Sequence, residues 1–256
     1  MSVSLREYLD FAMDAAWRAG QLTLGHFQTG VTVERKADQT PVTVADRGAE
    51  ELLRALIRER FPDHAVLGEE LGHGDTDSSH RWILDPIDGT QAFVHGVPLF
   101  GVLVGLEIAG EMVVGVCHLP ALRETVAAAL GEGCRWNGRR ARVSPLRRLD
   151  QALVAYTDAA TLVAHPSGAW GRLQTATRMQ RGWSDCYAYC LVATGRAEVA
   201  IDGLMSPWDC AALVPILREA GGTFTDWNGQ TRIDGGQAVA TNGVLFEPVM
   251  KLLRGD

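Results

Sequence analysis

One stretch of the sequence, WILDPIDGT from Trp82 to Thr90, places two carboxylates three positions apart directly after an apolar run. The apolar run is typical of a short buried strand, and the fixed φ of Pro86 followed by Asp88 and Gly89 is typical of a tight turn. Two unit charges about 4 Å apart interact by about 1 kcal/mol in water and by about 4 kcal/mol at an effective dielectric of about 20. A fold that brings such acids together therefore needs a positive charge among them.

Acidic side chains occupy three further positions where a predicted strand ends or a predicted helix begins. Asp46 starts a predicted helix, Glu69 and Glu70 follow the residues VLG, and Asp209 follows Trp208 at the start of another helix. Taken singly, Asp46 and Asp209 have a simple explanation as caps, because a helix amino terminus stabilises one carboxylate. Taken together, the repulsion among these acids is comparable to the net stability of a domain, about 5 to 15 kcal/mol, unless a cation lies among them.

The candidate ligands of that cation are all oxygens. The sequence has no HExxH motif, and its five cysteines are odd in number and lack CxxC spacing, which suits reduced thiols better than a zinc site or a disulfide framework. Oxygen ligands favour a hard cation such as Mg²⁺ or Mn²⁺ over Zn²⁺. The sequence therefore predicts a site for a hard divalent cation.

Composition and charge narrow the class of protein. The chain has 256 residues, of which 46% are hydrophobic and 21% are charged, as in an ordinary globular protein with a large core. A formal net charge of -7 argues against a broad contact with nucleic acid or anionic lipid, and the arginines of residues 139–148 are interpreted as a solvated turn and linker. Charged residues interrupt every apolar run before the roughly 20 residues that a membrane helix needs. We therefore expect a cytoplasmic protein that binds neither nucleic acid nor membrane.

The periodicity of the apolar residues predicts two helices and a sheet in the first part of the chain. Helical stripes lie near residues 5–17 and 49–57, and the strand-like runs that follow include a hairpin expected to turn at Ala109 and Gly110. Residues 1–145 are therefore predicted to form an α+β half, with helices packed on an antiparallel sheet.

The remainder of the chain alternates strands and helices. A composition shift near residues 144–151 precedes this alternation, so residues 146–256 are predicted to form an α/β half. One helix is expected over WDCAALVPILREAGG at residues 208–222. Trp183 and Tyr187 are expected to pack in the core, although either could flank an aromatic ligand.

Three motifs occur in an order that resembles the inositol monophosphatase superfamily. They are GEE at residues 68–70, DPIDGT at residues 85–90, and WDCAALVPILREAGG at residues 208–222, and the similarity extends from ADQTPVTVADRGAE to VATNG. The resemblance implies an α/β protein with the layered αβαβα sandwich of the inositol monophosphatase and fructose bisphosphatase type, with the site between the two halves. It also implies a homodimer and a metal-dependent phosphomonoester hydrolase.

The same resemblance assigns the ligands of the metal. Two or three Mg²⁺ ions, with Mn²⁺ as an alternative, would be held by the motif residues Glu69, Asp85, Ile87 through its carbonyl, Asp88 and Asp209. Glu70 is assigned to catalysis as a ligand of an outer water or a support of the other ligands. Two metals about 3.5 to 4 Å apart can stabilise both the attacking and the leaving oxygen of an in-line displacement.

Three motif residues are assigned to the reacting groups. By resemblance, Thr90 and Asp46 orient the attacking water and relay its proton, which needs hydrogen-bond reach and no strong base. Gly89 and Thr90 would begin a helix whose free N–H groups bind the phosphate, because a residue without a Cβ permits close backbone approach.

Two further acids and two segments of the sequence indicate which phosphate ester is the substrate. KADQTPVTVADRGAE and DPIDGTQAFVHGVPLFGVLVGLE resemble the histidinol-phosphate phosphatase branch most, although FVHG also occurs in inositol-type enzymes and Gln91 replaces the Lys or Asn expected there. Asp185 and Asp202 would favour histidinol phosphate over neutral inositol, because each charge-assisted hydrogen bond to its ammonium or imidazole contributes about 1.5 to 3 kcal/mol. The alternative for both acids is a solvated surface.

Three other functions stay open at this point. An inositol 1-phosphate phosphatase is the main alternative. A 3′-phosphoadenosine 5′-phosphate phosphatase would need basic or stacking groups near the site, for which Arg178 and Arg181 are candidates. A non-catalytic ligand-binding homologue would be expected to lack one of the acids or Thr90, and all of them are present. In each case the partner is a small-molecule phosphate monoester or a related ligand.

Overall fold

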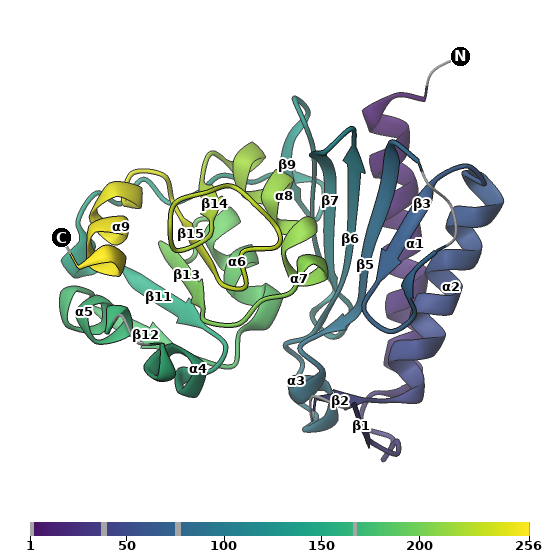
Figure 1. Cartoon of the computed structure of the whole chain (residues 1–256), viewed down its shortest axis with the longest axis horizontal. Coiled ribbons are helices and arrows are strands. Elements are labelled where there is room, and N and C mark those ends of the chain that lie inside the picture. Colours follow the sequence, from purple (N-terminus) through teal and green to yellow (C-terminus); the bar gives the residue numbers. More distant parts are fainter. Residues whose placement is uncertain (1–2, 37–39, 75–77, 166–167, 256) are drawn as a thin grey trace.

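A computed structural model of the chain describes residues 3–36, 40–74, 78–165 and 168–255. Five layers lie side by side, in the order helices, sheet, helices, sheet, helices (Figure 1). The predicted αβαβα sandwich is therefore confirmed. Within the described ranges, no helix is both long enough and apolar enough to cross a membrane.

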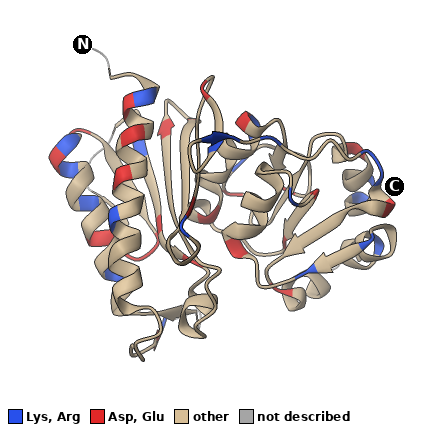
Figure 2. Cartoon of the chain, turned by 180° about the vertical axis from the view of Figure 1, so that it is seen from behind, with Lys and Arg blue, Asp and Glu red and all other residues tan. Residues whose placement is uncertain are grey.

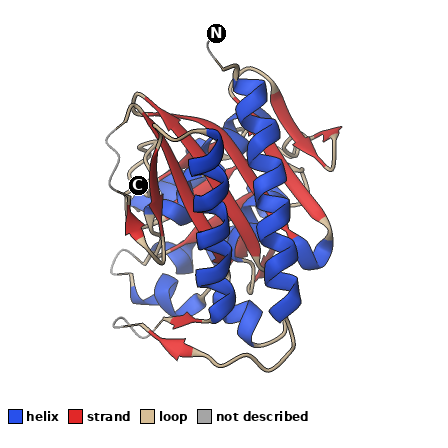
Figure 3. Ribbon diagram, turned by 90° about the vertical axis from the view of Figure 1, so that its right-hand side faces the viewer, coloured by secondary structure: helices blue, strands red, loops and turns tan. Residues whose placement is uncertain are grey.

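The first layer consists of helices α1 (Leu5–His26) and α2 (Val44–Arg60), which lie across one face of the first sheet (Figure 3). Each begins at a capping box, Ser4 with Glu7 in α1 and Thr43 with Asp46 in α2, in which the two side chains satisfy free N–H groups of the first turn. Their apolar faces pack against the sheet through fully buried residues such as Ala16 of α1. Both helices were predicted from the periodicity.

The first sheet has eight strands in the order β10-β9-β8-β7-β6-β5-β3-β4. The strands are β3 (Ala65–Gly68), β4 (Gly72–His73), β5 (His80–Asp88), β6 (Gly101–Ile108), β7 (Glu111–Leu119), β8 (Glu124–Ala129), β9 (Gly133–Trp136) and β10 (Arg139–Arg140). The hairpin of β6 and β7 turns at Ala109 and Gly110, which both have positive φ, as predicted. Arg139 and Arg140 are exposed but form an edge strand, coloured blue in Figure 2, where the sequence predicted a turn.

The prediction of an antiparallel sheet was wrong for one pair, because β3 and β5 are parallel. The short edge strand β4, which no pattern in the sequence predicted, reverses the chain after β3, so that the chain enters β5 in the direction of β3. The carboxyl ends of β3 and β5 consequently lie at the same end of the sheet. A separate two-stranded sheet of β1 (Glu34–Arg35) and β2 (Pro41–Val42) precedes α2.

The second sheet has five strands in the order β12-β11-β13-β15-β14. They are β11 (Leu153–Tyr156), β12 (Met179–Arg181), β13 (Val199–Asp202), β14 (Thr223–Thr225) and β15 (Ala238–Thr241). Helices α6 (Asp185–Ala193), α7 (Pro207–Ala211) and α8 (Leu213–Ala220) fill the space between the sheets, and α4 (Ala159–Ala164), α5 (Ala169–Ala176) and α9 (Phe246–Arg254) lie beyond the second sheet. The sequence analysis had not identified α4, α5 and β12.

The single helix expected over residues 208–222 is two helices, α7 and α8, separated at Ala212. Pro215 has no N–H to donate to the carbonyl of Ala211, four residues earlier, and its ring crowds that carbonyl. The interruption lets the Ala212 carbonyl lie against β7, where a Cβ on Gly115 would come within 2.0 Å of the Ala212 oxygen. This close approach fixes α7, which carries Asp209, against the first sheet.

Candidate metal centre

The parallel pairing of β3 and β5 brings two of the predicted acids together. Gly68 of β3 pairs with Leu84 of β5, and the N–H of Glu69 donates to the carbonyl of Leu84 at 3.2 Å. Glu69 and Asp85 therefore leave neighbouring strands at the same level. The end of β5 runs into helix α3 (Thr90–Val94) between the two halves of the molecule (Figure 1).

The DPID turn directs its two carboxylates to one side. The N–H of Ile87 donates to Asp85 Oδ1 at 3.0 Å, which closes a local turn around Pro86, and the pairing with β6 shifts register between Asp85 and Asp88. Asp88 Oδ1 accepts the N–H of Cys186 at 2.7 Å from the start of α6. The turn is thus held from both halves of the chain.

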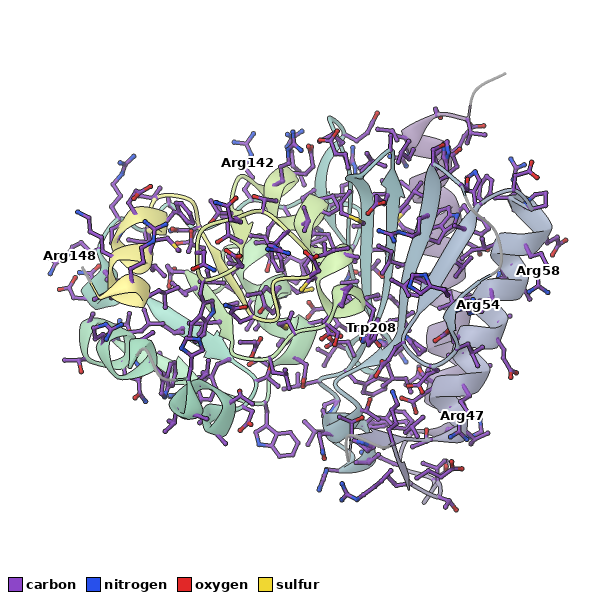
Figure 4. All side chains as sticks on the ribbon, viewed as in Figure 1. Arg47, Arg54, Arg58, Arg142, Arg148 and Trp208 are labelled. Carbon is purple, nitrogen blue, oxygen red and sulfur yellow. The ribbon has the colours of Figure 1, made fainter. Side chains whose placement is uncertain are left out.

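The third acid of the centre comes from α7. Asp209 is the third residue of that helix and forms a capping box with Ser206, whose N–H donates to Asp209 Oδ2 at 2.7 Å. One carboxylate oxygen each of Asp85, Asp88 and Asp209 lies within 4.8 Å of the others, close enough to share one cation. Figure 4 shows the neighbouring Trp208 between the first sheet and the helices of the second half, where it packs against the core.

Glu69 and Glu70 share a cation partner that the sequence analysis had not assigned. Lys36 Nζ donates to Glu69 Oε1 at 2.7 Å and to Glu70 Oε1 at 2.6 Å. Burial alone would lower the pKa of Lys36, but the hydrogen bonds to both glutamates raise it above its ordinary value. Lys36 therefore remains charged and neutralises part of the acidic group.

A second unassigned residue, Glu50 of α2, holds the turn that carries Glu69 and Glu70. Glu50 is fully buried, and its carboxylate accepts the N–H groups of Glu70 at 2.7 Å and Leu71 at 3.2 Å and the Nε of Arg54 at 2.8 Å. The sequence did contain a signal, because Glu50 lies at helical spacing within the buried stripe of α2. A single acid on a helix is nevertheless most often solvated, so the pattern did not single it out.

Asp46 caps α2, which is one of the two roles weighed for it in the sequence, and it also lies beside Thr90. Its Oδ2 accepts from the N–H of Thr43 at 2.8 Å and from the hydroxyl of Thr43 at 2.6 Å, which caps α2. Its Oδ1 faces the Thr90 hydroxyl at 3.4 Å, and that hydroxyl also donates to the Ile87 carbonyl at 3.0 Å. The structure thus places Asp46 and Thr90 next to each other at the start of α3.

Burial shifts the pKa values of the clustered acids in one direction. Burial, followed by the charge of Asp185, raises the pKa of Asp88 to about 8, and burial, followed by the charge of Asp88, raises that of Asp209 to about 7. Burial also raises the pKa of Glu70 to about 7, and that of Asp85 well above its usual range. A divalent cation among these oxygens would favour their charged forms, and an all-oxygen donor set fits Mg²⁺ or Mn²⁺.

Gly89 and Asp185 lie together at the edge of this cluster. Gly89 caps α3 with a φ of 86°, and a Cβ there would come 3.1 Å from Asp185 Oδ2. Burial, followed by the charges of Asp202 and Asp209, raises the pKa of Asp185 to about 7. Asp202 lies deeper, where Oδ1 accepts the N–H of Thr157 at 2.8 Å and Oδ2 accepts the Tyr189 hydroxyl at 3.0 Å.

The core assignment was wrong for Trp183 and confirmed for Tyr187. Trp183 is 49% exposed and has a φ of 59° in the turn before α6, and its ring forms a T-shaped pair with the ring of His95 at a centroid distance of 5.8 Å. Tyr187 packs against the buried cluster between the sheets and accepts from Arg196 through its hydroxyl at 3.2 Å. An exposed aromatic ring therefore stands two residues from Asp185.

Comparison with known proteins gives consistent matches over the whole chain. A model of the inositol monophosphatase family matches residues 4–254. The histidinol-phosphatase of Chlorobaculum parvum is 45% identical over 240 residues, which cover 93% of this chain and 93% of that protein. The inositol-1-monophosphatase of Mesorhizobium japonicum is 33% identical over 254 residues, which cover 96% of each. Among solved structures, an IMPase of Thermotoga maritima superimposes with a TM-score of 0.89 at 32% identity and covers 97% of both chains.

Proposed function

Because the chain belongs to the inositol monophosphatase family, we propose that it hydrolyses L-histidinol phosphate to L-histidinol and phosphate in a Mg²⁺-dependent reaction. The broader activity, that of a phosphomonoesterase, follows from the family and from the phosphatases that the chain resembles. The observation that carries the choice of substrate is Asp185. Its carboxyl group lies beside Gly89, outside the three-acid group, and forms no salt bridge with any described residue.

The metal ligands in this proposal are the side chains of Glu69, Asp85, Asp88 and Asp209 and the carbonyl of Ile87. Bound Mg²⁺ would neutralise these acids, polarise a phosphoryl oxygen and lower the pKa of the attacking water. Glu70 supports Glu69 through their shared partner Lys36.

The chain's own groups orient the reactants. Asp46 Oδ1 and the Thr90 hydroxyl, 3.4 Å apart, would hold the attacking water by hydrogen bonds and pass its proton to Asp46. Burial raises the pKa of Asp46, which suits a carboxylate that receives a proton. The backbone N–H groups at the Gly89 turn would donate to the phosphate, where the left-handed φ and the missing Cβ keep the approach open.

The substrate's cationic end meets Asp185 in this proposal. An ammonium group at this carboxylate would relieve the repulsion that Asp202 and Asp209 exert on it. Asp202 would contribute through its charge, since both of its oxygens already accept hydrogen bonds. The exposed ring of Trp183 and the adjacent His95 would form a wall for the imidazole.

The proposal also includes a cytoplasmic location and assembly into a homodimer. All five cysteines are buried free thiols, which suits a reducing compartment such as the cytoplasm. The enzyme would act there as a homodimer on a small-molecule phosphate monoester. Light scattering coupled to size-exclusion chromatography tests this, and a monomeric mass at micromolar concentration would reject the dimer.

A phosphate-release panel tests the substrate. With Mg²⁺ present, histidinol phosphate should give a higher kcat/KM than inositol 1-phosphate, 3′-phosphoadenosine 5′-phosphate or fructose 1,6-bisphosphate. Asp185→Asn should lower kcat/KM for histidinol phosphate by about 10-fold to 150-fold relative to that for inositol 1-phosphate, so that general effects on the metal centre cancel. The exposed Asp234→Asn variant serves as the control. A best rate on inositol 1-phosphate would reject the substrate assignment.

A further inference from the structure

A second polar cavity lies outside the metal centre, where α2 meets the outer edge of the first sheet. Its volume is about 330 Å³, and it is lined by Arg54, Ile57, Arg58, Pro62, His64, Val66 and Gly74. Among the residues that the structure describes, the lining includes two arginines and a histidine but no acidic side chain. A cavity with this lining is suited to an anion.

The two arginines are one helical turn apart. Arg54 and Arg58 occupy positions i and i+4 of α2, where like charges destabilise a helix. Figure 4 labels both side chains on α2. Within the part of the chain that the structure describes, Arg58 forms no salt bridge and no hydrogen bond. An anion between the two arginines would remove this repulsion and give Arg58 a partner.

Three side chains, those of Arg54, Arg58 and His64, have hydrogen-bond donors available to such an anion. Arg54 uses Nε for Glu50 and Nη2 for the Gly72 carbonyl, which leaves Nη1 without a partner among the described residues. His64 Nδ1 accepts from Trp82 Nε1 at 3.1 Å, so the proton of the neutral ring is on Nε2. Burial lowers the pKa of His64, which keeps the ring neutral and makes it a donor at neutral pH. The guanidinium of Arg58 supplies the remaining donors.

We propose that this cavity binds a phosphate group, either as inorganic phosphate or as part of a small phosphomonoester. Arginine recognises phosphate through paired hydrogen bonds, and the apolar side chains of Ile57, Pro62 and Val66 offer a wall for an organic substituent. The site does not depend on the proposed function, since its residues hold neither the metal nor the reacting phosphate.

Anion binding in this cavity would influence the metal centre through Arg54 and Glu50. Arg54 is bonded to Glu50, and Glu50 accepts the N–H groups of Glu70 and Leu71 in the turn that carries the predicted metal ligands. A phosphate held by Nη1 would fix the Arg54 side chain while leaving its bond to Glu50 in place. Phosphate binding should therefore order this turn.

Calorimetric titration of the metal-free full-length protein with inorganic phosphate tests the site. A chelator keeps the metal centre empty of cations, so its acids repel the probe. Wild-type protein and the exposed Arg147→Ala variant should bind phosphate saturably, and Arg58→Ala should bind it at least about tenfold more weakly. Glycerol 3-phosphate is the second probe, and tighter binding than that of inorganic phosphate identifies a phosphomonoester as the natural ligand, whereas equal or weaker binding identifies inorganic phosphate.

Hydrogen exchange under the same conditions tests the coupling. Phosphate should slow exchange at the amides of Glu70 and Leu71 in the wild type and leave it unchanged in Arg58→Ala. Equal phosphate affinity in the wild type and Arg58→Ala, or no saturable binding in either, would overturn the proposed site. Binding without slower exchange would overturn its link to the metal centre. All of these readouts are obtained without turnover, so failure of the substrate assignment would leave them intact.

Discussion

The carboxyl group of Glu50 occupies the space that a side chain on Gly68 would fill, since a Cβ on Gly68 would lie 2.1 Å from Glu50 Oε1. Gly68 is the glycine of the GEE motif, and its φ is not in the left-handed region. The glycine is therefore required by the close approach of a buried acid rather than by backbone conformation. This contact fixes the turn that presents Glu69 and Glu70.

Gly68→Ala should lower the free energy of unfolding by about 1 to 3 kcal/mol, because the new methyl group must displace a buried, hydrogen-bonded carboxylate. Denaturant unfolding measures the change. Gly25→Ala in α1 is a matched control, because nothing lies within 4 Å of its Cβ, and it should leave stability unchanged or slightly higher. Equal stabilities of the two variants would show that Glu50 does not constrain Gly68.

Lys36→Met should destabilise the metal-free protein more than the protein with saturating Mg²⁺. Without the ammonium group, Glu69 and Glu70 lose the charge that they share, whereas a bound cation would still neutralise them. Thermal unfolding of variant and wild type, with Mg²⁺ and with chelator, measures both differences. The same loss of stability under both conditions would contradict a shared role of Lys36 and the metal.

Thr90→Ala should lower kcat by about 10²-fold to 10⁴-fold, because the hydroxyl that faces Asp46 and the attacking water would be lost. Thr90→Ser keeps that hydroxyl and should retain most of the activity. Single-turnover phosphate release separates this step from product release. Similar rates for the two variants would remove Thr90 from the reaction.

Because of His118, the free energy of unfolding should decrease at acidic pH. Burial lowers the pKa of His118 to about 4 from the ordinary value of 6.5, and its Nε2 has no hydrogen-bond partner among the described residues. Because the unfolded state binds the proton more tightly, this group's contribution is complete above about pH 6.5 and is lost as the pH falls toward about 4. The loss is on the order of 3 kcal/mol.

His118→Gln removes that titration, so its stability should fall less steeply than that of the wild type between pH 6.5 and pH 4. Urea unfolding at several pH values gives both slopes. If the free energies of unfolding of the wild type and the variant fell in parallel with pH, His118 would not be held in its neutral form.

Local patterns in the sequence predicted most of the architecture. The stripes of α1 and α2 and the hairpin at Ala109 and Gly110 are set by neighbouring residues, so periodicity and turn chemistry identified them. The direction of β5 relative to β3 depends on β4, a two-residue edge strand without a pattern of its own. The separation of α7 from α8 has a local cause in Pro215, which the single helix predicted over the motif did not take into account.

In the candidate site, too, residues marked by a local pattern were predicted, and residues that act through distant contacts were not. Asp85 and Asp88 stand out because two acids follow an apolar strand, and Glu69 and Asp209 stand out at the end of a predicted strand and the start of a predicted helix. Motif similarity then assigned all four as metal ligands. Lys36 and Glu50 hold the turn at Glu69 and Glu70 through contacts that span 20 or more positions in the sequence, and a lone lysine or glutamate carries no local sign of such partners. The residue type of Trp183 favours burial, whereas the ring is 49% exposed in a turn where its φ is positive.

Asp85, Asp88 and Asp209 are predicted to hold a divalent cation between them. Crystals soaked with Mn²⁺ and measured for anomalous scattering give the position of the ion directly. We expect a peak bonded to a carboxylate oxygen of each of these three residues, at about 2.0 to 2.6 Å, that disappears in Asp88→Asn crystals with an otherwise unchanged fold. No peak among the three carboxylates in the wild type, with Mn²⁺ bound elsewhere or not at all, would contradict it.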